Sequence, residues 1–153
     1  MPPVHRVVSA QIAASPADVK SFYVDLDNIV DLHPLVVDVR SLSRVATAEG
    51  YEQTYRVKDV VPLSFLRYLG LKLPIAYTAT LTVPDSGPVI SCARQFPRVR
   101  LDAVVSFDPE GAGTRLTERI AISAPRLLRG ITVGRAVAAH TDMLDGIRRH
   151  FSG

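Results

Sequence analysis

The stretch "GITVGRAVAAHTDMLDGIRRHF", Gly130 to Phe151, decides how this chain is expected to fold. When its residues are placed 100° apart, the apolar ones gather into one narrow stripe, and Asp142 and Arg149 fall away from it. The pattern predicts a helix of about 35 Å from Arg129 to Phe151, at about 1.5 Å per residue, which is long enough to cross a curved sheet. The stripe consists of Val133, Val137, His140, Leu144, Ile147 and Phe151.

Three glycines and one histidine are unusual in such a helix. Gly130, Gly134 and Gly146 each cost about 1 kcal/mol relative to alanine in a helix interior. Gly130 and Gly134 either leave room beside a ligand, or reflect close packing against a loop or fraying at the helix start. His140, at the centre of the stripe, either points into a cavity as an acid–base group or is a core histidine satisfied by one neighbour.

Seven segments before this helix are expected to be strands, because apolar and polar residues alternate in them and turn residues separate them. Short turns such as "PDSGP" predict a meandering antiparallel sheet. Ser15 and Pro16 predict a short helix after the first strand, and a second short helix is expected over 25–32. The expected strands cover 4–14, 35–46, 50–60, 73–83, 89–97, 99–109 and 113–123.

One strand, two small helices, six strands and a long helix form a specific order. The opening "VSAQIAASPADVKSFYVDLDNIVDLHPLVVDV", residues 8–39, is similar to that of the START, birch-pollen-allergen and polyketide-cyclase superfamily, often called SRPBCC. The resemblance covers essentially the whole chain. It implies a single α+β domain, residues 1–153, with the helix-grip fold: a seven-stranded curved antiparallel sheet, two short helices after the first strand, and the last helix packed across the sheet.

The resemblance also implies a cavity between sheet and helix that takes lipids, sterols, polyketides or other apolar molecules. Some relatives catalyse cyclisation or dehydration there, and many only bind and carry. We therefore expect binding, transport or sensing of a small apolar ligand (lipid, polyketide or isoprenoid-like) without a cofactor. Two alternatives stay open: an enzyme of the polyketide cyclase/dehydratase type, and a protein-interaction or dimerisation module.

The inward faces of the expected strands supply candidate ligand contacts. Tyrosines in phase with these faces offer an apolar body and a hydroxyl, although core packing explains them almost as well. Glu118 is in phase with Leu116 and Ile120; a carboxylate facing a cavity could exchange a proton, whereas a register shift of one residue would expose it. Glu118 and His140 are the candidate catalytic pair. The candidate contacts are Tyr51, Tyr55, Tyr77, Leu81, Leu101, Val105, Phe107, Leu116, Glu118, Ile120, Val137, His140 and Leu144.

The segment "VVPLSFLRYLGLKLP", residues 60–74, is too apolar for a solvated connection. It fits a lid over the cavity mouth, a peripheral membrane contact beside Arg67 and Lys72, or a contact within a homodimer. Strand ends with a buried helical turn explain it as well. The candidate lid or membrane residues are Phe65, Leu66, Tyr68 and Leu69.

Composition excludes several other classes of protein. The net charge is only +3, the arginines are scattered and there is no tryptophan, so nucleic-acid binding is disfavoured. A single cysteine, Cys92, excludes an internal disulfide and favours a reducing, cytoplasmic compartment. No secretory signal or membrane span is recognisable. The four histidines are dispersed in the sequence, so no metal site is expected.

Overall fold

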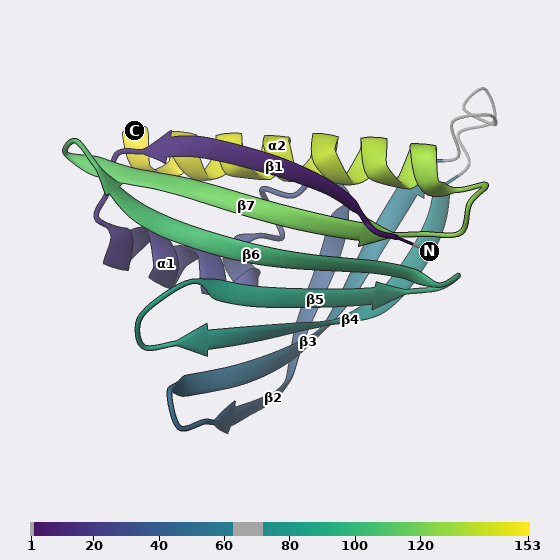
Figure 1. Ribbon diagram of the computed structural model, residues 1–153, viewed down its shortest axis with the longest axis horizontal. Helices are drawn as coiled ribbons and strands as arrows, with labels where there is room; N and C mark the ends of the chain where they lie inside the picture. Colours follow the sequence, from purple (N-terminus) through teal and green to yellow (C-terminus); the bar gives the residue numbers. More distant parts are fainter. Residues whose placement is uncertain (1, 63–71) are drawn as a thin grey trace.

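A computed structural model describes residues 2–62 and 72–153. Seven strands form one antiparallel sheet in the order β1-β7-β6-β5-β4-β3-β2, and one long helix crosses it (Figure 1). This confirms the α+β helix-grip architecture expected from the sequence. The elements are β1 (Val4–Ile12), α1 (Pro16–Val24), η1 (Leu26–Asn28), β2 (Val36–Ala46), β3 (Gly50–Pro62), β4 (Lys72–Pro84), β5 (Val89–Gln95), β6 (Val99–Glu110), β7 (Gly113–Ser123) and α2 (Arg129–Ser152).

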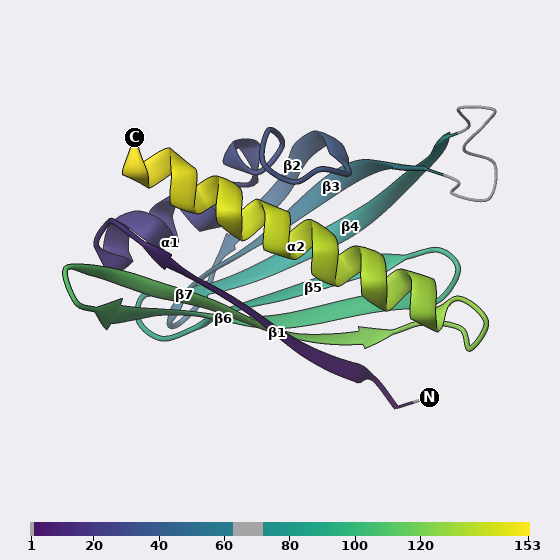
Figure 2. The same ribbon diagram turned by 90° about the horizontal axis from the view of Figure 1, so that it is seen from above.

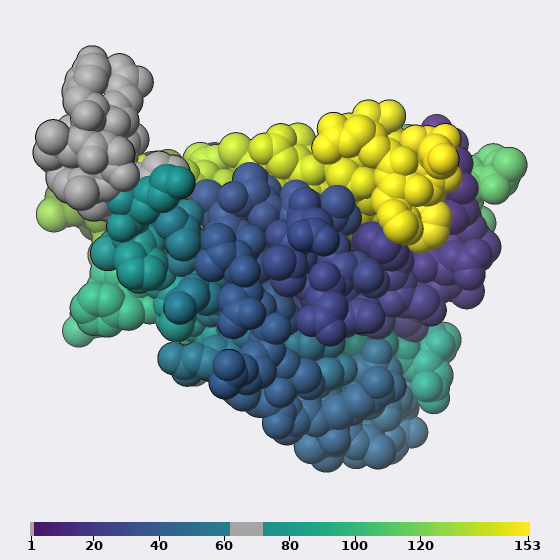
Figure 3. Space-filling view, turned by 180° about the vertical axis from the view of Figure 1, so that it is seen from behind, coloured from purple at the N-terminus to yellow at the C-terminus, as the bar shows by residue number. Residues whose placement is uncertain are grey.

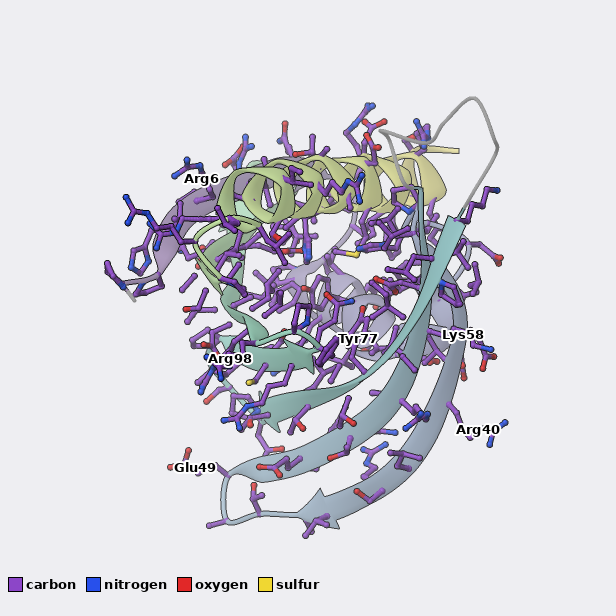
Figure 4. All side chains as sticks on the ribbon, turned by 90° about the vertical axis from the view of Figure 1, so that its right-hand side faces the viewer. Arg6, Arg40, Glu49, Lys58, Tyr77 and Arg98 are labelled. Carbon is purple, nitrogen blue, oxygen red and sulfur yellow. The ribbon has the colours of Figure 1, made fainter. Side chains whose placement is uncertain are left out.

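Helix α2 lies diagonally across one face of the sheet (Figure 2). The backbone of α2 packs most closely on β1 and also approaches β7. Strands β2 to β4 curve down and away from the helix, so side chains rather than backbone fill the space between them (Figure 4). The helix therefore lies close to the β1 edge of the sheet and farther from the β2 edge.

The start of the chain follows the local signals in its sequence. The hydroxyl of Ser15 accepts a hydrogen bond from the backbone N–H of Asp18 at 3.2 Å, and Pro16 occupies the first turn of α1. The second short helix is shorter than expected, because only Leu26–Asn28 forms a 3-10 turn. The chain then continues through turns to β2.

The buried face of α2 is wider than the predicted stripe, because Ala139, Met143 and Gly146 are also buried. A Cβ placed on Gly146 would lie 3.0 Å from the end of the Leu32 side chain, so this glycine allows close packing against the connection between α1 and β2. Gly130 and Gly134 have no such neighbour within 4 Å. No helix in the described part of the chain is long and apolar enough to cross a membrane.

Candidate functional site

Three side chains from three elements meet inside the fold. Nδ1 of His140 on α2 lies 2.6 Å from Oε2 of Glu118 on β7. The hydroxyl of Tyr23 on α1 donates to Oε1 of the same carboxylate at 3.1 Å. Both oxygens of Glu118 are thus engaged, and its side chain has no exposed surface.

The register of the sheet explains why Glu118 points inward. On β7 it stands between Leu116 and Ile120, which are both buried, and it lies opposite Val8 on β1 and Val105 on β6. Glu118 therefore faces the helices, in phase with its apolar neighbours. A carboxyl in such a place needs partners, because burying an unpaired charge is very costly.

The Glu118 carboxylate raises the pKa of both partners. Burial lowers the pKa of His140, but the charge and hydrogen bond of Glu118, helped by the charge of Asp59, outweigh burial and raise it above 6.5. Burial and the neighbouring Glu118 also raise the pKa of Tyr23 well above its ordinary value. His140 is thereby favoured in its charged form, paired with Glu118, and Tyr23 remains a hydrogen-bond donor.

A second histidine lies against the first. The rings of His33 and His140 meet edge to face, with centroids 5.6 Å apart. Nδ1 of His33 accepts a hydrogen bond from the backbone N–H of Leu35 at 3.3 Å. Burial, with the nearby charge of His140, lowers the pKa of His33 to about 3, so this ring is neutral at neutral pH.

A carboxyl–tyrosine pair forms the side of the cluster nearest β3 and β4. The hydroxyl of Tyr77 donates to Oδ1 of Asp59 at 3.2 Å. Burial raises the pKa of Asp59 to about 6, although the Tyr77 hydrogen bond and the charge of His140 oppose the rise. Burial and the Asp59 charge raise the pKa of Tyr77, so its hydroxyl keeps its proton. Figure 4 shows Tyr77 pointing from β4 into the space below α2.

Inward-facing residues below the N-terminal half of α2, which we call the accessible end, include several that are less buried than those at the other end. Below the C-terminal half of α2 the core is closed, and residues 15–35 cover its side between α2 and the β2–β3 hairpin (Figure 3). Below the N-terminal half, Tyr77, Leu101 and Val137 face inward but remain half-buried. His140 lies where the two parts meet, with 17 % of its side chain exposed. Its Nε2 atom has no hydrogen-bond partner among the described residues.

The other candidate contacts lie in different surroundings. Tyr51 lies near the β2–β3 turn, where the guanidinium of Arg44 stacks 3.7 Å above its ring. The Tyr55 hydroxyl donates to the carbonyl of Val24 at 3.3 Å, and Phe107 packs edge-on against Tyr23. Phe65, Leu66, Tyr68 and Leu69 lie outside the described residues. The remaining candidates, Leu81, Val105, Leu116, Ile120 and Leu144, are core residues with almost no exposed surface.

The sequence interpretation missed three members of the cluster: Tyr23, His33 and Asp59. Asp59 carried a usable signal, because it is in phase with Tyr55 and Val57 on β3, as Glu118 is with its neighbours on β7. The positions of Tyr23 and His33 gave no comparable signal, since only the folded chain brings them to β7 and α2.

Two depressions open on the surface at the accessible end. One is lined by residues of the β5–β6 turn, and the other lies between this turn and the connection from β7 to α2. Neither is lined by Tyr77 or His140. Within residues 2–62 and 72–153, no group of three or more His, Cys, Asp or Glu side chains could hold a metal ion.

Solved structures share this arrangement of strands and helices. One domain of StfQ, a di-domain aromatase/cyclase of the steffimycin biosynthetic pathway, superposes with a TM-score of 0.77 at 12 % identity, covering 98 % of this chain and 51 % of that one. A START superfamily protein from Mycobacterium smegmatis gives a TM-score of 0.68 at 13 % identity over 97 % and 99 %.

The chain has the helix-grip fold of the START-like (SRPBCC) proteins. The Zhui aromatase/cyclase from Streptomyces sp. R1128 shares this fold with a TM-score of 0.69 at 14 % identity over 96 % and 94 %. No family model and no curated protein matches the sequence. At identities this low, likeness establishes the fold alone, so function has to be argued from the site.

Proposed function

We propose that this helix-grip protein binds a small apolar molecule below the N-terminal half of α2. The observation that carries the proposal is that Tyr77, Leu101 and Val137 face inward yet stay half-buried, whereas Leu116, Leu144 and Ile147 are almost completely buried. Accessible apolar surface inside a fold is costly in water, and a bound apolar ligand would cover it.

The ligand would carry an oxygen atom at one end. The floor of this region combines the Asp59–Tyr77 pair with the Nε2 atom of His140, which has no partner among the described residues, amid apolar side chains. A ligand hydroxyl or carbonyl could hydrogen-bond there, and its apolar part would lie along Leu101 and Val137. A few polar groups within an apolar lining are typical of small-molecule sites. A lipid, polyketide or isoprenoid with a polar end fits this chemistry.

Native mass spectrometry of the protein after exposure to lipid extract from its own cells would test the proposal. We expect an adduct of defined mass on the wild-type chain. Val137→Trp would fill the accessible region and remove the adduct, whereas Ala138→Trp, on the exposed side of the same helix, would keep it. Absence of any adduct, or equal adducts on both variants, would contradict ligand binding at this place.

Acid–base catalysis on the bound molecule is a second candidate function, favoured by the 2.6 Å contact between Glu118 and His140. A carboxylate that engages Nδ1 orients the ring and leaves Nε2 to exchange a proton with a ligand. Aromatase/cyclases such as StfQ and Zhui share the fold. Under this proposal, Glu118→Gln would still bind the ligand found by mass spectrometry, His140→Asn would bind it more weakly, and neither variant would convert it. Conversion at wild-type rates by either variant would exclude the dyad as catalyst.

A further inference from the structure

Large apolar side chains are exposed at the accessible end of the molecule. Phe96, in the β5–β6 turn, is 86 % exposed, and Leu127, just before α2, is 93 % exposed. Leu128 and Ile131 beside them are also exposed. We call these four residues the apolar tip. Exposed residues of this size gathered at one place mark interaction sites.

The two parts of the tip adjoin each other. One depression of about 560 Å³ is lined by Phe96 and Arg98 from the β5–β6 turn and by Pro125 and Leu127 from the β7–α2 connection. Figures 1 and 2 both show these loops side by side, near the first turn of α2. Because two separate loops present their apolar residues in the same place, the tip is one surface.

The charge around the tip is positive. Arg94, Arg98 and Arg126 flank it, and these three form no ion pair within the described part of the chain. Residues 94–101 and 124–141 contain no aspartate or glutamate. Arg100 is paired with Asp102 at 2.7 Å, so it contributes less to the net charge. The surface therefore complements an anionic partner.

We propose that the tip docks the protein on an anionic lipid bilayer. Phe96 and Leu127 project almost wholly into solvent from two loop ends, which suits insertion below lipid headgroups better than contact with a shaped protein groove. The flanking arginines would lie at the level of the phosphates and attract acidic lipids. The inference stands on this surface alone and does not depend on what the interior binds.

Vesicle sedimentation of the full chain tests the proposal with phosphatidylcholine alone and with phosphatidylcholine mixed with phosphatidylserine. We expect binding to the mixed vesicles and little to the neutral ones, weakening at high salt. Arg94→Gln with Arg98→Gln should weaken binding about 25-fold, since each arginine near the surface contributes roughly fivefold. Phe96→Ser with Leu127→Ser should weaken it about tenfold by removing the inserted groups.

Matched controls come from the opposite part of the sheet. Arg40→Gln with Arg56→Gln removes two exposed arginines that lie opposite each other on β2 and β3, and Leu42→Ser with Val45→Ser removes two exposed apolar residues of β2. Neither control pair should change binding. The proposal is overturned if mixed vesicles are not bound, or if the control pairs weaken binding as much as the tip pairs. Loss of binding only in the arginine pair would show electrostatic attraction without insertion of the apolar tip, and would also overturn the proposal.

Discussion

Oε2 of Glu118 lies 2.6 Å from Nδ1 of His140, although 22 positions separate the two residues in the sequence. Glu118 is held at the centre of the buried face of β7, and His140 reaches it from the helix that crosses the sheet. The contact links the sheet to α2 through a polar pair whose carboxylate is fully shielded from solvent.

Replacing Glu118 by glutamine should lower the pKa of His140. Without the carboxylate, the charge and hydrogen bond that raise this pKa are lost, and burial, which lowers it, prevails. The pKa is measured from the imidazole resonances of His140 as a function of pH. Tyr23→Phe is the matched control: it removes the other partner of Glu118 but leaves the charge, so the pKa of His140 should stay raised. An unchanged pKa in Glu118→Gln would contradict the pairing.

Asp59→Asn should stabilise the protein at neutral pH. The folded-state pKa of about 6 exceeds the ordinary 3.8, so the folded protein binds this proton more tightly than the unfolded chain. Stability from this group is therefore highest below about pH 4 and declines as pH rises to 6. Asparagine does not titrate, so the variant avoids this loss of about 1–2 kcal/mol in the free energy of unfolding, after solvent screening is allowed for. Urea unfolding at pH 4 and pH 7 measures the free energy of unfolding of both proteins. A variant less stable than the wild type at pH 7 would contradict the expectation.

His33→Asn should reduce the loss of stability in acid. The folded-state pKa of about 3 lies below 6.5, so the unfolded chain takes up this proton first as the pH falls. The contribution of neutral His33 is complete above about pH 6.5 and is lost progressively toward pH 3. Asparagine keeps an acceptor near the N–H of Leu35 but does not titrate. Between pH 7 and pH 4, the midpoint temperature of thermal unfolding should fall less steeply for the variant than for the wild type. Equal slopes would contradict a lowered pKa of His33.

The glycines of α2 should respond differently to alanine. A Cβ at Gly134 meets nothing within 4 Å, so Gly134→Ala should raise the free energy of unfolding by about 0.5–1 kcal/mol through helix propensity. At Gly146 the same Cβ comes within 3.0 Å of Leu32, and the gain is offset by the displacement of that side chain. Gly146→Ala should therefore be less stable than Gly134→Ala in chemical unfolding. Equal stabilisation by both would show that Leu32 does not constrain Gly146.

The fold was predictable because the signals for it are local. Alternation along residues 113–123 gives the phase that buries Glu118, and the helical spacing of His140 puts it on the face toward the sheet. Only part of the site was predictable, because Tyr23 and His33 reach it through tertiary contacts. Tyr23 lies on α1, and His33 lies in an irregular turn. Asp59 is different, because an acid in phase with Tyr55 and Val57 on β3 can be recognised from the sequence.

Binding of the neutral fluorescent probe N-phenyl-1-naphthylamine tests most directly whether the interior below Val137 is accessible. We expect the wild-type chain and Ala138→Trp to enhance the probe's fluorescence with similar affinity. Val137→Trp, checked for folding by circular dichroism, should not enhance it. Val137→Phe, a smaller change, should weaken binding in part. Equal enhancement by all four chains, or none by the wild type, would contradict an accessible interior between Tyr77 and His140.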